Sequence, residues 1–224
     1  MRLVGTEAGR VVQVVHADEI RPVRGFDLPR VVQLISNKYG FSVTPTDYAG
    51  FSQPTGLRFE RGRCVVPSVG EVAISDLSLF NDGVIAGCAD TDIADQVVND
   101  VVDFLVREEM IRRPATPRPR TYTSNVIVEL DRLKGGILEQ VFKSAARLRS
   151  ALFDQYGWEN QTSLHHIAFS ADPLEMPHYR NTLFAIERRG SIPYPDQWFW
   201  SVAPLPLSKH LELLEAIEKD LANV

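Results

Sequence analysis

The sequence predicts an α+β protein made of two tandem modules, each an antiparallel sheet with helices. Three observations support this fold class. Strand-like and helix-like apolar periods follow one another in a similar order twice along the chain. A proline-rich segment separates the two series. Hydrophobic residues make up 44% and charged residues 24% of the 224 residues, which is typical of a globular protein. We therefore expect a first module at 1–112, a linker at 113–120 and a second module at 121–224.

The first module is predicted to start with a strand and a helix. Residues 11–15 form an apolar run that favours a strand. Asp27 is a typical N-cap, Pro29 suits the first helical turn, and Gly40 suits the position just after a helix. The helix is therefore expected between Asp27 and Gly40. Two short strands are predicted after it, at 41–44 and 57–60.

The rest of the first module is predicted to be a hairpin followed by a helix. Asn81-Asp82-Gly83 is the best hairpin signal, because such residues accept the positive φ of a tight turn. Strands at 71–80 and 84–88 flank it, and a helix opens at Thr91-Asp92. The order of the module is thus β-α-β4-α. The apolar face of the second helix carries Ile93, Val97, Val101, Phe104 and Leu105, and its other face carries Asp92, Asp95, Asp100 and Asp103.

The second module is predicted to follow the order β-α-β3-α. Alternation of Val126, Val128 and Leu130 indicates a strand at 122–130. A long amphipathic helix is expected from about Gly136, and a final helix is expected to be capped by Ser208. Further strands are predicted at 164–169, 182–188 and 198–203. The apolar stripes are Leu138, Val141, Phe142, Ala145, Leu148 and Leu152 in the long helix, and Leu211, Leu214, Ile217 and Leu221 in the final one.

The segment between the modules contains Pro114, Pro117 and Pro119, interspersed with arginines. Prolines at this spacing neither continue a helix nor occupy a central strand, because each lacks an N–H and has a fixed φ. The segment is therefore predicted to be an extended linker. The similar element orders on its two sides favour an internal duplication or an intramolecular pseudo-dimer, although no residue-level repeat is visible.

Composition narrows the functional classes. The formal net charge is −5, and residues 1–112 contain 11 Lys and Arg against 16 Asp and Glu, whereas residues 113–224 contain 13 of each. Such a balance argues against a general nucleic-acid binder, which usually needs a basic face. Cys64 and Cys88 are too few for a tetrahedral thiolate site. No apolar run has the ~20 residues of a membrane span, so the sequence predicts a cytoplasmic protein without membrane contact.

Candidate catalytic residues are sparse. His165 and His166 lie on a predicted strand, where successive side chains point to opposite faces, so they do not converge easily on one ion. His165 shares its face with apolar residues and is expected to be buried. With His178 they make a metal-dependent enzyme the third function hypothesis. Nucleophile-elbow, phosphate-loop and dinucleotide motifs are absent from the sequence. No cofactor is therefore predicted.

Two candidate partner surfaces remain. Trp198 and Trp200 share one face of a predicted strand, either as sheet core or as an exposed aromatic patch of the kind found at protein interfaces. Four cations, in the linker and on the long helix, form a candidate basic strip or an ordinary solvated face; they are Arg118, Arg120, Lys143 and Arg147. The leading hypothesis is a non-catalytic interaction protein, an adaptor or subunit of a larger assembly, with a protein partner or self-association. A nucleic-acid-binding protein is the second hypothesis.

Overall fold

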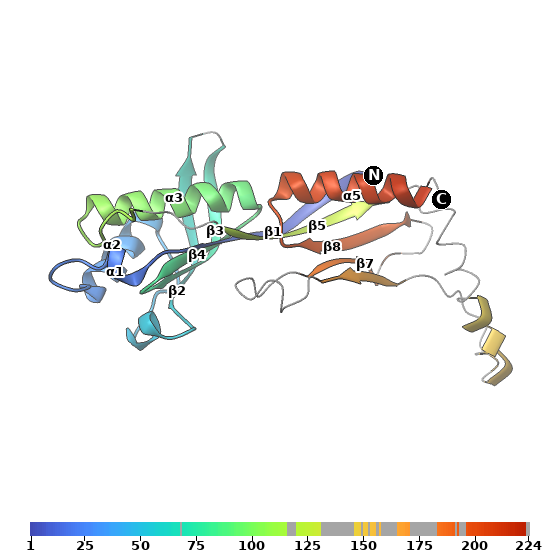
Figure 1. Ribbon diagram of the computed structural model, residues 1–224, viewed down its shortest axis with the longest axis horizontal. Coiled ribbons are helices and arrows are strands. Elements are labelled where there is room, and N and C mark those ends of the chain that lie inside the picture. Colours follow the sequence, from blue (N-terminus) through green and yellow to red (C-terminus); the bar gives the residue numbers. More distant parts are fainter. Residues whose placement is uncertain are drawn as a thin grey trace. The chain divides into compact units, whose positions relative to one another are not determined.

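The computed structural model describes residues 1–67, 69–115, 120–130, 146–148, 150–151, 153–155, 157, 165–170, 183–190, 192 and 196–222. Within these residues the chain is a mixture of helices and strands (Figure 1). Eight described strands form one antiparallel sheet in the order β2-β3-β4-β1-β5-β8-β7-β6. The mixed fold class predicted from the sequence is confirmed. The strands are β1 (Arg2–Val14), β2 (Leu57–Val66), β3 (Gly70–Phe80), β4 (Gly83–Cys88), β5 (Thr121–Glu129), β6 (His166–Phe169), β7 (Phe184–Arg188) and β8 (Trp198–Ala203).

The chain divides into two compact units. The N-terminal unit comprises residues 7–124 and 205–207, and the C-terminal unit comprises residues 1–6, 125–204 and 208–224. The N-terminal unit contains α1 (Ala17–Ile20), α2 (Leu28–Tyr39), the 3-10 helix η1 (Ala49–Ser52) and α3 (Thr91–Arg107). The C-terminal unit contains nearly all of α5 (Leu207–Ala222). The domain limits expected at 113–120 stay a prediction.

Local capping signals determine both long helices of the N-terminal unit. The Asp27 side chain accepts a hydrogen bond from the Arg30 N–H, and Gly40 ends α2 with φ of 58°. This confirms the predicted helix. Helix α3 begins at Thr91, as the sequence predicts. Its N-cap is Asp90, whose carboxylate accepts from the Ile93 N–H at 2.8 Å. Figure 1 shows α3 running along the strands of this unit.

The β3–β4 hairpin lies where the sequence predicts it, with Phe80 paired to Gly83. The expected reason was wrong, because Asn81, Asp82 and Gly83 are not among the described residues with positive φ. Neighbouring backbone holds this turn instead. The Asn81 N–H donates to the Phe51 carbonyl at 2.9 Å. Gly83 is required by space, since a Cβ there would lie 2.4 Å from the Gln13 carbonyl oxygen.

Residues 41–44 do not form the strand expected from their apolar pattern. They contribute only an isolated bridge between Val43 and Glu60, so the first module has three strands after α2 rather than four. Strand β2 is longer than predicted and reaches Val66. Its interior contains Arg61 with φ of 56° and Gly62, over which the Phe41 ring lies. These two residues break the alternation of β2, which explains why the sequence pattern ended early.

The core of the N-terminal unit lies between the helices and one face of the strands. Val31 and Ile35 of α2, Val97 and Val101 of α3 and Phe59 of β2 belong to one cluster, and each is at most 4% exposed. The apolar face predicted for α3 therefore packs against the sheet. Burial of this extent is the main stabilising contribution to the unit.

In the C-terminal unit, the strand predicted at 198–203 is confirmed as β8, while β6 and β7 are shorter than expected. The described residues between β5 and β6 include helical ones, at 146–148, 150–151 and 153–155. Ser208 lies inside α5 rather than capping it. None of the helices in the described part of the chain is long and apolar enough to span a bilayer.

Candidate functional site

Strand β8 presents two different faces. Phe199 and Ser201 are buried. Their side of the strand faces α5, as shown by the 2.9 Å distance between Ser201 Oγ and the Nε2 of His210 on that helix. Alternation along a strand sends Trp198 and Trp200 to the other side. Both tryptophans are partly exposed. The partition of β8 side chains between two faces follows the sequence prediction.

We call the second side the tryptophan face: Trp198, Trp200 and Val202 of β8 with Ala185 and Glu187 of β7. Val202 is paired directly with Ala185, and Trp200 with Glu187, and residues paired in this way share a face. Val202 and Ala185 are 9% and 2% exposed. The face therefore combines a buried apolar centre, two partly accessible indole rings and one carboxylate.

The opposite side of β8 holds a buried serine–histidine pair. Ser201 donates its only proton to the Ala185 carbonyl oxygen at 2.8 Å. The His210 Nε2 must therefore donate to Ser201 Oγ rather than accept from it. This is the reverse of the proton transfer that activates a serine nucleophile. Both side chains are 0% exposed, and the pair is a structural contact between β8 and α5.

Burial lowers the pKa of His210 to about 4. In the unfolded chain the histidine has its ordinary pKa near 6.5, so the unfolded chain binds the proton first as the pH falls. The contribution of neutral His210 to stability is therefore fully present above about pH 6.5. This contribution falls as the pH drops from about 6.5 to about 4, by about 3 kcal/mol in all. We expect His210→Gln to remove this component, so that urea unfolding free energies of wild type and variant converge as the pH falls. Parallel pH curves would contradict the assignment.

The histidines considered for metal binding do not gather in the described residues. His165 precedes β6, and its Nε2 lies 3.4 Å from Glu187 Oε1. Its side chain is 66% exposed, so the expectation of a buried His165 was wrong. His166 is exposed on the edge strand β6. His178 lies outside the described residues. Across the described ranges, no three His, Cys, Asp or Glu side chains are grouped to hold a metal ion.

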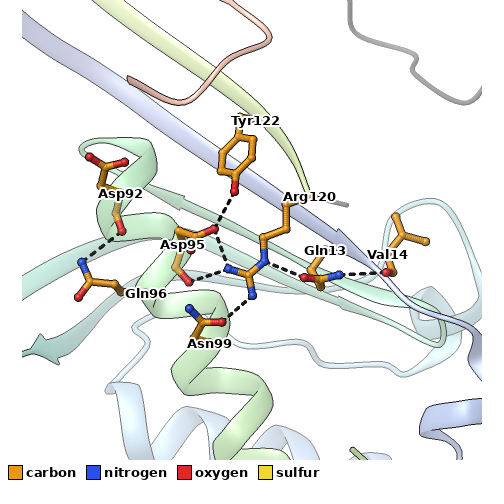
Figure 2. A network of polar contacts seen from close by, with 8 residues as sticks. All are labelled: Gln13, Val14, Asp92, Asp95, Gln96, Asn99, Arg120 and Tyr122. Carbon is orange, nitrogen blue, oxygen red and sulfur yellow. Dashed lines mark hydrogen bonds and ion pairs between the residues drawn. The ribbon is translucent and has the colours of Figure 1, made fainter. Parts of the chain in front are cut away.

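Arg120 has an internal role at the start of β5. Figure 2 shows its guanidinium between Gln13 of β1 and the α3 residues Asp95 and Asn99. The Nε donates to Gln13 Oε1 at 2.7 Å, and Nη2 donates to Asn99 Oδ1 at 2.6 Å. The Nη1 lies 2.7 Å from Asp95 Oδ1, which also accepts from the Tyr122 hydroxyl at 3.1 Å. The Arg120 side chain is only 18% exposed.

The acidic face of α3 is paired with cations from other parts of the N-terminal unit. Asp95 pairs with Arg120, and Asp103 pairs with Arg113 at 2.8 Å. Both ends of the proline-rich segment are thus attached to α3. Of the other residues proposed for the basic strip, Arg147 is exposed on a helical segment. Arg118 and Lys143 lie outside the described residues.

Asp100 forms a third pairing, beside an open groove between α2, α3 and β2. Its Oδ2 lies 2.6 Å from Lys38 Nζ and accepts from the Tyr39 hydroxyl at 2.7 Å. The Lys38 ammonium also lies 4.3 Å from the centre of the Phe104 ring. Cys64 lines the groove with them, its Sγ 3.8 Å from Asp100 Oδ2.

The protonation states in this cluster do not suit nucleophilic chemistry. Burial, and then the charge of Asp100, raises the pKa of the Cys64 thiol. Burial and the hydrogen bond to Asp100 likewise raise the pKa of Tyr39. Burial opposes ionisation of Asp100, but hydrogen bonds from Lys38 and Tyr39 outweigh it and lower the pKa of the carboxyl. The thiol and the phenol therefore stay protonated at neutral pH, and only the thiolate is an effective nucleophile.

Sequence reasoning singled out the tryptophans but missed the polar partners that organise the N-terminal unit. Gln13, Asn99 and Lys38 carried no local signal, whereas the aspartates on α3 were visible in the sequence and are the acceptors to which these networks are built. Comparison with known proteins does not extend this picture: the sequence matches no protein-family model and no curated protein.

Proposed function

We propose that this protein is a non-catalytic interaction protein, an adaptor or subunit of a larger assembly, which binds a protein partner through the tryptophan face. The observation that carries the proposal is that two partly exposed indoles, Trp198 and Trp200, lie on the same side of β8. Tryptophan is enriched among residues that dominate binding energy, because a large rigid surface is buried at little cost in conformational entropy.

The surroundings of the indoles resemble the anatomy of a protein interface. Val202 and Ala185 provide an apolar centre, while Glu187 and the adjacent exposed His165 provide a polar border. Interfaces combine a desolvated apolar core with such a rim. A base-stacking platform would need cations beside the aromatic rings. Glu187 is paired directly with Trp200, whereas the Arg189 N–H donates to the Trp198 carbonyl, so a carboxylate and an arginine both lie next to the indoles.

The domain organisation is proposed to be a tandem duplication, with its linker at 113–120. Strand order β2-β3-β4-β1 in one half corresponds to β6-β7-β8-β5 in the other. Each series also ends in a helix, α3 or α5. With residues 41–44 forming no strand, both halves follow the order β-α-β3-α, which supports an internal duplication or pseudo-dimer better than the sequence pattern did.

The basic strip is proposed as a secondary contact that steers an acidic partner. Arg147 is exposed and available for such a role, with Arg118 and Lys143 as its proposed companions. Arg120 lies at the end of the strip, but its guanidinium is already bonded to Gln13 and Asn99 within the N-terminal unit, so its part in steering is proposed to be the smallest of the four. Exposed charges of this kind mainly affect the association rate and its salt dependence.

The partner site is tested by replacing both indoles. We expect Trp198→Ala and Trp200→Ala each to weaken binding of a co-purifying protein by roughly 30-fold, as hot-spot residues do. Affinity is measured with the purified partner, at low and high salt. Tyr48→Ala is the matched control, because Tyr48 is an exposed aromatic residue of the other unit, 39% exposed.

Each outcome decides between the function classes. Folded tryptophan variants that bind like wild type would rule out the tryptophan face. A bound nucleic acid whose affinity falls steeply with salt would replace the protein-binding hypothesis by the nucleic-acid one. A stoichiometric metal in the purified protein, lost on replacing His166 or His178, would revive the enzyme hypothesis.

A further inference from the structure

Phe169 is an exposed aromatic side chain on the α5 side of the C-terminal unit. It is paired directly with Phe184, and the two rings stack with centroids 6.0 Å apart. Phe184 contacts the His210 ring of α5 edge-on at 6.1 Å. Phe169 therefore continues the apolar layer beneath α5 outward to the edge strand β6. Phe184 is 7% exposed, but Phe169 is 60% exposed.

The corresponding edge of the N-terminal unit is covered by a helix. There β2 occupies the outer position of the sheet, as β6 does in the other half. Its apolar residues Leu57 and Phe59 are 1% and 0% exposed. Val31 and Ile35 of α2 belong to the same core cluster. The outer strand is thus covered by the helix that precedes it in the chain.

The C-terminal unit has helical residues at the same place in the chain, between β5 and β6. They include Leu148 and Phe153, which are 55% and 50% exposed. Leu148 belongs to the apolar stripe of the amphipathic helix identified in the sequence. An amphipathic helix is stabilised mainly by packing its apolar face on another element.

We propose that this helical segment binds the β6 edge of its own sheet on the α5 side, with Leu148 against Ile167 and Phe169. The two exposed apolar surfaces are complementary in character, and the covalent connection gives them a high effective concentration. Binding also covers an edge strand that would otherwise be a template for pairing with other chains. This site is separate from the tryptophan face, which lies on the other side of the sheet.

Thiol labelling of the full chain tests the proposal. Phe169→Cys is expected to react at least roughly tenfold more slowly than Val65→Cys, because a covered thiol reacts only on local opening. Val65 is the reference because its side chain is 75% exposed. Wild type measures the background from the buried Cys64 and Cys88. Adding Leu148→Asp should restore fast labelling, whereas adding Arg147→Asp at the neighbouring exposed position should not.

Fast labelling of a folded Phe169→Cys variant, equal to that of Val65→Cys, would overturn the proposal. Protection that increases with protein concentration would also overturn it, because the occupant would then be the helix of a second copy. If Phe169→Cys loses its circular dichroism spectrum, Ile167→Cys on the same face of β6 replaces it. Slow labelling of that variant supports the proposal, and fast or concentration-dependent labelling contradicts it, as for Phe169→Cys.

Discussion

Methionine in place of Arg120 is expected to lower the free energy of unfolding of the N-terminal unit by about 3–5 kcal/mol. The substitution keeps much of the apolar stem but removes the donors to Gln13 and Asn99 and the partner of Asp95. Gln13 is 5% exposed, so water does not easily replace the lost bond. Urea unfolding followed by circular dichroism measures the change.

Arg113→Met is the matched control for this prediction. It also removes an arginine that pairs with an aspartate of α3, but both side chains are mostly exposed, at 65% and 59%. Exposed pairs contribute about 0–1 kcal/mol. Arg120→Lys should fall between the two, because an ammonium cannot reach three acceptors with the geometry of a guanidinium. Equal effects of Arg113→Met and Arg120→Met would show that the network is ordinary solvated surface.

The Arg120 network also shows what the sequence could not reveal. The linker arginines and the acidic face of α3 were both recognised, but the arginines were assigned to an external partner or to solvent, and the acidic face was assigned no partner. In the structure Arg113 and Arg120 pair with that helix. The bond from Arg120 to Gln13 joins residues 107 positions apart. Charge patterns indicate that a group needs a partner, but only the fold determines which distant residue supplies it.

Elements with local signals were predicted well. Helix α2 follows from Asp27 and Gly40, and strand β8 from its alternating aromatic residues. Prediction failed where tertiary contacts override the local pattern. Residues 41–44 make only one bridge to β2. The positive φ of Arg61 interrupts the alternation of apolar and polar residues in β2, so the sequence pattern did not predict the second half of that strand.

The candidate site was predictable in part for the same reason. Period-two alternation placed Trp198 and Trp200 together. The buried polar residues behind them carried no such signal. His210 is a buried polar residue of α5, and its ring meets the Ser201 hydroxyl on β8. An isolated histidine in an apolar stripe predicts a hydrogen-bond partner without naming it.

Alanine in place of Gly9 is expected to destabilise the N-terminal unit by about 3–5 kcal/mol. Gly9 pairs with Cys88 in the centre of the sheet. A Cβ at this position would lie 2.0 Å from the Asp90 carbonyl carbon and 2.2 Å from the Thr91 nitrogen. These are backbone atoms at the start of α3, so no side-chain rotation relieves the clash. The helix must move away from β1, which opens the core beneath it.

Gly5→Ala provides the control on the same strand. No heavy atom outside its chain neighbours lies within 4 Å of a Cβ built at Gly5. Its alanine variant should change the unfolding free energy by less than about 1 kcal/mol, with a small gain from the reduced entropy of the unfolded chain. Because both changes add one methyl group to β1, a difference between them measures the close approach of α3 to Gly9. Similar urea midpoints for the two variants would mean that α3 does not begin against β1.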